Sequence, residues 1–134
     1  IKLIQTHPAT QFSTIADDVQ QAERINKKFN EAGLNLNVYI DLNVGMNRTG
    51  IIPGESAIEL YDFIQSASHL NFSGLHVYDG QHRQANPIER EQACELAFQK
   101  VYTWIEKLEQ KGYARPLIIA GGSPSFSIHA KKTK

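Results

Sequence analysis

The chain has 134 residues, 41% of them hydrophobic and 21% charged, which is ordinary for one globular domain with a single core. Fourteen basic residues balance fourteen acidic ones, so nothing in the composition points to a nucleic-acid partner or an anionic membrane surface. We find no apolar run of membrane-spanning length and no signal-peptide pattern, and we expect a cytoplasmic protein. The one cysteine, Cys94, excludes an internal disulfide and is expected to be a small buried helix residue.

Apolar runs between turn residues predict four strands, and helical periodicity predicts three helices between them. Asp17 or Asp18 can cap the first helix, and Gly33 can end it. Asn86, with Glu89 three residues later, is typical of a capping box at the start of the third. The predicted elements in chain order are strand 12–15, helix 17–32, strand 37–42, a helix that begins at Pro53 and Gly54, strand 71–78, a helix from Pro87 to the stop at Gly112, and strand 117–120.

Four strands separated by helices imply parallel pairing with right-handed crossovers. Two α/β architectures fit this order: an open doubly wound sheet, or part of a (β/α)8 barrel, of which a chain of this length supplies about half. In both, binding groups gather where the strands end. The unusual residues lie there, at 43–48, 76–80 and 121–123.

The loop after the second predicted strand encloses an arginine between glycines. Gly45 and Gly50 can adopt backbone angles closed to other residues, and Arg48 carries a rigid, permanently charged fork of donors. The pattern fits a binding group held at the end of a buried strand. A solvated Arg48 in an ordinary turn explains it about as well.

The turn after the last predicted strand is the best candidate phosphate site. Gly121 and Gly122 let backbone N–H groups approach a ligand closely, and Ser123 adds a hydroxyl donor. A flexible strand-to-loop turn is the simpler alternative. The GxSxG pattern of a nucleophilic serine is absent.

Other reactive side chains allow less specific interpretations. His76 and Tyr78 lie on one face of their strand and could frame a planar ligand or form a core pair. His76, Asp79 and His82 are too loosely spaced to indicate a metal site, so none is predicted. Trp104 lies on the apolar stripe of the third helix and is expected in the core.

Three segments resemble successive motifs of one enzyme family: DLNVGMNRTG at 41–50, GLHVYDG at 74–80 and IAGGSPSF at 119–126. They are similar to the fold-type III pyridoxal-phosphate enzymes, the alanine-racemase-like barrels, and most similar to the D-threonine aldolase and D-serine dehydratase branch. The order and spacing agree over nearly the whole chain. The resemblance implies that residues 1–134 form part of one cofactor-binding barrel domain, approximately strands four to seven, without the first strands and the C-terminal β domain.

The resemblance also implies roles for single residues. It places Arg48 beside the phenolic oxygen of pyridoxal 5′-phosphate, Tyr78 and His76 in the pocket of its ring, and the turn at 121–123 around its phosphate. The lysine that bonds the cofactor in this family lies on the first strand, so no catalytic residue is assigned here. Lys2 has no matching context.

Two positions depart from the family pattern. Asn43 stands where an aspartate is usual, and Gln81 separates the YDG segment from the histidine at position 82. Either change could alter the proton-carrying groups of the pocket. The metal-binding pair of the aldolase and dehydratase branch belongs to the C-terminal domain, so a divalent metal is expected only in the full-length protein.

The implied parent protein is an enzyme that acts on a D-amino acid or 3-hydroxy-amino acid by aldol cleavage, elimination or racemisation. This chain alone is expected to be inactive because it lacks the lysine. A non-catalytic pyridoxal-phosphate carrier and an open-sheet phosphate-ligand binder remain alternatives, although the second lacks a GxGxxG motif. The chain begins with IKLIQ and stops at HAKKTK, as an interior piece would, and the open edges of half a barrel predict a homodimer or cover by further chain.

Overall fold

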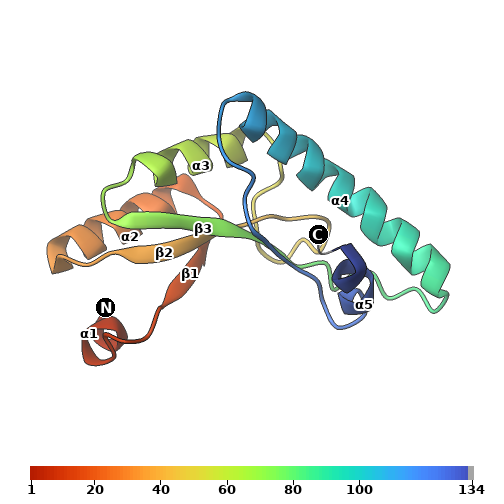
Figure 1. Cartoon of the computed structure of the whole chain (residues 1–134), viewed down its shortest axis with the longest axis horizontal. Coiled ribbons are helices and arrows are strands. Elements are labelled where there is room, and N and C mark those ends of the chain that lie inside the picture. The colour runs from red at the N-terminus through yellow and green to blue at the C-terminus, as the bar shows by residue number, and fades with distance from the viewer. Residues whose placement is uncertain (133–134) are drawn as a thin grey trace.

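Four parallel strands form one sheet in the order in which they occur along the chain (Figure 1). The computed structural model describes residues 1–132. Each strand pairs with the next one through a helical crossover, as the alternating sequence pattern predicts. The strands are β1 (Ser13–Ala16), β2 (Leu36–Asp41), β3 (Leu70–Val77) and β4 (Ile118–Ala120).

Three long helices connect these strands, and short helical turns lie near both ends of the chain. The long helices confirm the three predicted ones, whereas the short turns were not predicted because they have too few residues for a periodic pattern. The long helices are α2 (Val19–Ala32), α3 (Glu55–Ser66) and α4 (Pro87–Gln110); the short ones are α1 (Lys2–Thr6), α5 (Phe126–His129) and the 3-10 helix η1 (Ala130–Lys132).

The predicted helix ends form largely as their turn chemistry indicates. The Asp18 carboxylate accepts a hydrogen bond from the Gln21 N–H at 2.8 Å, and Gly33 ends α2 in a left-handed conformation. Asn86 accepts from the Ile88 N–H at 2.9 Å at the start of α4. Within residues 1–132, no Glu89 hydrogen bond completes the predicted capping box.

The long helices cover one face of the sheet (Figure 1). Val38 and Ile40 of β2 and Leu75 and Val77 of β3 point to that face and are fully buried in the core. Trp104 of α4 is buried with them and donates its indole N–H to the Gly54 carbonyl at 3.1 Å, which confirms its predicted core position. A doubly wound sheet has helices on both faces, so the fold is the other predicted architecture, part of a (β/α)8 barrel.

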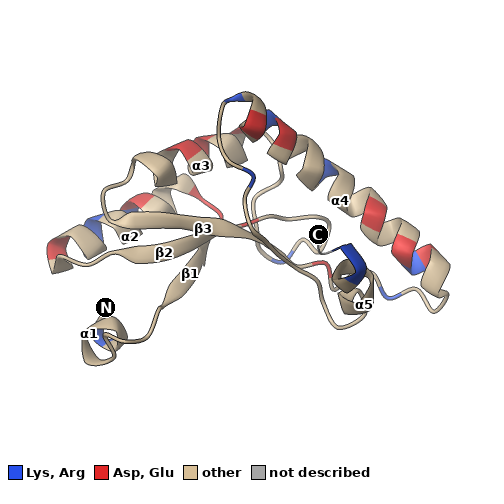
Figure 2. Cartoon of the chain, viewed as in Figure 1, with Lys and Arg blue, Asp and Glu red and all other residues tan. Residues whose placement is uncertain are grey.

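The opposite face of the sheet is open. Ile15 of β1 and Ile119 of β4 are 42% and 48% exposed there, beside Tyr39 and His76. We call this the open inner face; it is lined by Ser13, Thr14, Ile15, Tyr39, His76 and Ile119. Charged residues lie mostly on the helices, whereas the strands have almost none (Figure 2). No helix in residues 1–132 is long and apolar enough to cross a bilayer.

Candidate functional site

The loop that carries Arg48 is shaped by Asn43, the residue that departs from the family motif. The Asn43 side-chain oxygen accepts hydrogen bonds from the Gly45 N–H at 2.9 Å and the Asn47 N–H at 3.2 Å. The Asn43 amide group donates to the Asn47 side-chain oxygen at 3.1 Å. An aspartate could accept the first two bonds but could not donate the third, so the amide suits this loop.

Arg48 lies over the ring of Tyr78, the residue that follows β3. The guanidinium carbon is 4.7 Å from the ring centroid, a cation–π distance, and Arg48 forms no ion pair among the described residues. Its side chain is exposed, so the donors of the guanidinium remain available to a ligand. We call the depression beside it the Arg48 hollow; it is lined by Asp41, Asn43, Met46, Arg48, Thr49 and Tyr78.

The edge of the Tyr78 ring meets the glycines of two loops. A methyl group added at Gly122 would lie 2.9 Å from Gly80 Cα, closer than real side chains come, and 3.1 Å from Tyr78 Cε2, closer than most of them come. Gly122 therefore lets the turn after β4 pack directly against Tyr78. The three loop segments that the sequence singled out, around Arg48, Tyr78 and Gly122, meet at this ring.

The turn at 121–123 has fewer free donors than the sequence suggests. The Gly121 N–H donates to the Val77 carbonyl at 3.1 Å, and the Gly122 N–H lies 3.0 Å from an Asp79 carboxylate oxygen. Within the described chain, neither the N–H nor the hydroxyl of Ser123 has a protein partner, and this residue is exposed. A phosphate at this turn would therefore be bound mainly by Ser123, while the glycines shape the turn.

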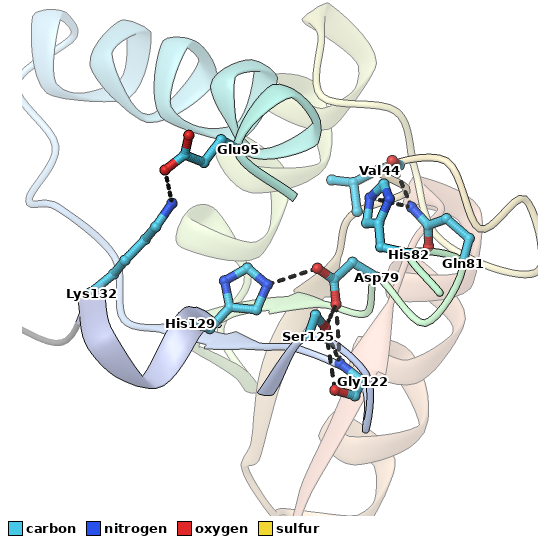
Figure 3. Close-up of polar contacts among 9 residues, drawn as sticks. All are labelled: Val44, Asp79, Gln81, His82, Glu95, Gly122, Ser125, His129 and Lys132. Carbon is cyan, nitrogen blue, oxygen red and sulfur yellow. Dashed lines mark hydrogen bonds and ion pairs between the residues drawn. The ribbon is translucent and has the colours of Figure 1, made fainter. Parts of the chain in front are cut away.

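Asp79 holds the same turn in place through hydrogen bonds (Figure 3). Its carboxylate is fully buried, and it accepts hydrogen bonds from the Gly122 N–H and from the Ser125 hydroxyl, the latter a very short one. The other oxygen lies 2.7 Å from His129 Nε2. We call Asp79, Gly122, Ser125 and His129 the Asp79 network. It ties the end of β3 to the turn after β4 and to α5.

The ionisation of Asp79 is set by two opposed effects. Burial raises the pKa of this carboxyl. Hydrogen bonds from His129 and Ser125 and the charge of His129 lower the pKa by more than burial raises it, so the net pKa lies below its ordinary value. Cys94 of α4 adds a weaker hydrogen bond. Burial and the adjacent Asp79 charge raise the pKa of the Cys94 thiol to about 11, which keeps this buried cysteine protonated and unreactive.

Asp79, His82 and Cys94 bring one potential metal ligand each to within 4.8 Å of one another. The sequence spacing did not suggest this group, because Cys94 comes from α4. The Asp79 carboxylate already accepts hydrogen bonds from the network and from Cys94, and a cation would have to displace the Cys94 proton. The arrangement is therefore explained as a hydrogen-bond network without a metal.

Asp41 and His76 form the remaining polar pair of the site. They face one another in the register of β2 and β3, and Asp41 Oδ1 lies 2.6 Å from His76 Nδ1. Asp41 lines the Arg48 hollow, whereas His76 lines the open inner face. The predicted site residues thus lie at the carboxyl ends of the strands, and Asp41 lies there with them.

Sequence reasoning missed the residues that support this site. Asp79 was considered for a metal site that was not predicted. Ser125 and His129 were given no role, because their partner Asp79 lies 46 and 50 positions away in the chain. Gln81 was noted only as a departure from the family pattern. Its amide donates to the Val44 carbonyl at 3.1 Å and so fastens the loop after β3 to the Arg48 loop (Figure 3).

Comparison with known proteins agrees with the fold. Two curated relatives are each 25% identical: 3-hydroxy-D-aspartate aldolase of Paracoccus denitrificans, over 82% of this chain and 29% of its own length, and D-threonine aldolase of an Arthrobacter species, over 88% and 31%. The crystal structure of D-threonine aldolase from Filomicrobium marinum superimposes with a TM-score of 0.86 and 27% identity, over 96% of this chain and 35% of that one. The chain thus spans about a third of the length of these relatives.

The fold is shared more widely than the sequence. An alanine racemase of Clostridium difficile 630 matches 84% of this chain and 30% of its own with a TM-score of 0.73 but only 14% identity, which shows a common fold. The family model for the alanine racemase N-terminal domain matches residues 2–133, almost the whole sequence. The chain therefore belongs to the alanine racemase N-terminal domain family.

Proposed function

We propose that this chain forms part of the pyridoxal-phosphate site of an enzyme that acts on D-amino acids or 3-hydroxy-amino acids, as an aldolase, dehydratase or racemase. The observation that carries the proposal is the contact of Arg48, Tyr78 and Gly122, which brings a cation, an aromatic ring and a glycine–serine turn together. The aldolase relatives support the substrate class, since their names specify D-configured hydroxy-amino acids.

The side chains at the site suit a flat, anionic cofactor. The Arg48 hollow offers a guanidinium without an ion pair among the described residues and an aromatic ring beside it. Within residues 1–132, Ser123 adds two unused donors next to Gly122, and one oxygen of the buried Asp41 has no hydrogen-bond partner. A polar ligand bound beside the Tyr78 ring would supply hydrogen-bond partners for these groups.

The residues of the chain would share the work of binding. Ser123 would donate to the phosphate, Arg48 to an oxygen on the ring, and Tyr78 would limit where the ring can lie. Pyridoxal phosphate, when bound, supplies an electron sink for cleavage of a bond at the substrate Cα. Asp79 would act indirectly by fixing the turn that presents Ser123.

We further propose that this chain alone lacks catalytic activity. The chemistry of this cofactor requires a lysine amine at its aldehyde carbon. No lysine of residues 1–132 lines the Arg48 hollow or the open inner face. The amine would therefore come from another part of the full protein, and the chain by itself would bind the cofactor without covalent attachment.

The two edges of the sheet support a homodimer as the preferred assembly. β1 and β4 each pair on one side only, so their other sides leave backbone donors and acceptors without strand partners. A second copy could cover them, as could further chain of the same protein. Light scattering after gel filtration tests this: a stable, monodisperse monomer of the chain contradicts the proposal.

Cofactor titration tests the proposed function. Pyridoxal 5′-phosphate should bind the chain, as measured by equilibrium dialysis, and pyridoxal without the phosphate should bind more weakly. Ser123→Ala should weaken the binding of pyridoxal 5′-phosphate about fivefold, which corresponds to the loss of one hydrogen bond, and should leave the binding of pyridoxal unchanged. Ser127→Ala, at an exposed position of the same segment, is the matched control. Equal binding of both ligands to both variants would contradict the phosphate assignment.

A further inference from the structure

The Asp41–His76 pair lies beside the proposed cofactor site and joins β2 to β3 through a polar side-chain contact. Asp41 is the last residue of β2, and His76 is its register partner near the end of β3. Both side chains lie on the face of the sheet away from the long helices. An inference about this pair rests on the proposed function, because that function supplies the ligand.

The Asp41 carboxylate is buried but only half used. Its side chain is 4% exposed, and Oδ1 lies 2.6 Å from His76 Nδ1. The second oxygen, Oδ2, has no hydrogen-bond partner in the described part of the chain. An ionised carboxylate can only accept hydrogen bonds, so Nδ1 of His76 must carry the proton. Asp41 thereby selects one tautomer of the imidazole.

The selected tautomer leaves a lone pair on Nε2 of His76. The His76 side chain is 31% exposed and lines the open inner face, and no hydrogen bond to Nε2 occurs among residues 1–132. The other residues that line this face, Ser13, Thr14, Ile15, Tyr39 and Ile119, carry no charge at neutral pH. A nitrogen with a lone pair, oriented by a buried carboxylate through the opposite nitrogen, is the arrangement of a general base.

We propose that His76 Nε2 accepts a proton from an amino acid that lies against the open inner face, next to the Arg48 hollow, and that Asp41, which lines that hollow, is its positioning residue. In this step the proton leaves an O–H or C–H bond of the ligand, the electron pair of that bond stays on the ligand, and an Nε2–H bond forms. The Asp41 carboxylate stabilises the imidazolium through Nδ1–H. The reverse transfer returns the proton and regenerates the neutral ring.

The tautomer can be measured directly in the chain. Long-range proton–nitrogen NMR of histidine-labelled protein should show His76 with a protonated Nδ1 and an unprotonated Nε2. In Asp41→Asn the side-chain amide can turn to donate to Nδ1, and the Nε2–H tautomer should become the major form. His69 is an internal control, since its Nδ1 lies 2.9 Å from the Leu34 carbonyl, which the substitution does not touch.

Two results would overturn the inference. One is a protonated Nε2 on His76 in the unaltered chain, a measurement that does not depend on whether Asp41→Asn folds. The other concerns pyridoxal 5′-phosphate with D-serine as the probe: if both bind by dialysis while the His76 Nε2 resonance does not move, the base lies elsewhere. Failure of the cofactor to bind would instead refute the proposed function. The tautomer measurement would then still decide whether Asp41 holds His76 with its proton on Nδ1. A moved Nε2 resonance with an unmoved His69 supports the proposal.

Discussion

Tyr78 and Asp79 are neighbours at the end of β3, yet their surroundings differ in kind. Tyr78 lies beside an arginine that has no ion pair in the described chain, and the nearby Asp41 leaves one buried oxygen unpartnered. Asp79 lies in a closed network in which both carboxylate oxygens accept hydrogen bonds. Successive residues of an extended segment point to opposite faces, so one residue step separates an open polar site from a satisfied one.

We infer two roles from this difference: the Tyr78 side binds a ligand, and the Asp79 network supports the fold. Polar groups without partners cost free energy when they are buried, and the buried Asp41 oxygen is such a group in the described chain, so a ligand at the proposed site would remove this cost. A satisfied buried network instead stabilises the fold and fixes a loop. Substitutions on the Asp79 side should therefore reduce stability, and substitutions on the Tyr78 side should reduce binding.

Asp79→Asn should have the largest effect. The amide keeps one acceptor oxygen but places an N–H2 group against a donor, so that Gly122, Ser125 or His129 loses its partner in a buried site. We expect the free energy of unfolding in urea to fall by about 3 kcal/mol. Glu59→Gln, at an exposed position of α3 with no hydrogen bond or ion pair in the described chain, should change it by less than about 0.5 kcal/mol. An Asp79 variant as stable as that control would show that the network contributes little.

Gly122→Ala should rank second because it acts on the contact between the two regions. The new methyl group would meet Gly80 Cα and the Tyr78 ring, so the turn or the ring must move, at a cost of about 2 kcal/mol in stability. Cofactor binding should weaken as well. Gly54→Ala is the matched control, since its methyl group would have only the Ile52 carbonyl nearby, at 3.8 Å. Similar losses in the two variants would argue against a tight contact at Gly122.

Lowering the pH should reduce the stabilisation by the Asp79 network gradually, and by less than the two preceding substitutions do. The folded-state pKa of Asp79 is below its ordinary value, so this group stabilises the fold fully above about pH 4, and the contribution is lost as the pH falls through the lower folded value. His129, His82 and Cys94 are the titratable groups that face the same carboxylate. Urea unfolding between pH 5 and pH 2.5 should therefore show a steeper loss for the unaltered chain than for Asp79→Asn. Parallel curves would contradict the lowered pKa.

The sequence predicted the fold because the fold depends on local patterns. Each strand was placed within two residues of its observed ends, since apolar runs between turn residues are visible without tertiary information. The choice between an open sheet and part of a barrel was not visible in these local patterns, and only the resemblance to the alanine-racemase-like barrels predicted it. The choice depends on which side of the sheet each helix packs, and helical periodicity does not encode that side.

The site was predictable only in part for the same reason. Arg48 and Tyr78 were noticed because they stand next to glycines at strand ends, where parallel sheets present functional groups. Asp41 was noted only for its place in the motif, and His129 had no readable role. Both act through residues 35 and 50 positions away, and only the register of β2 with β3 and the path of α5 bring these partners together.

Arg48→Met should leave stability almost unchanged and so isolates the binding side of the comparison. The side chain is exposed and its one described contact is the Tyr78 ring, so the free energy of unfolding should fall by about 0.5 kcal/mol or less. Pyridoxal 5′-phosphate should bind about tenfold more weakly, since a charged donor to the ring oxygen is lost while methionine keeps a similar length of apolar chain. Arg24→Met, at an exposed position of α2, should change neither quantity. If Arg48→Met instead destabilises the chain as much as Asp79→Asn does, then the Arg48 loop supports the fold. The proposed difference between a binding side at Tyr78 and a supporting side at Asp79 would then be wrong.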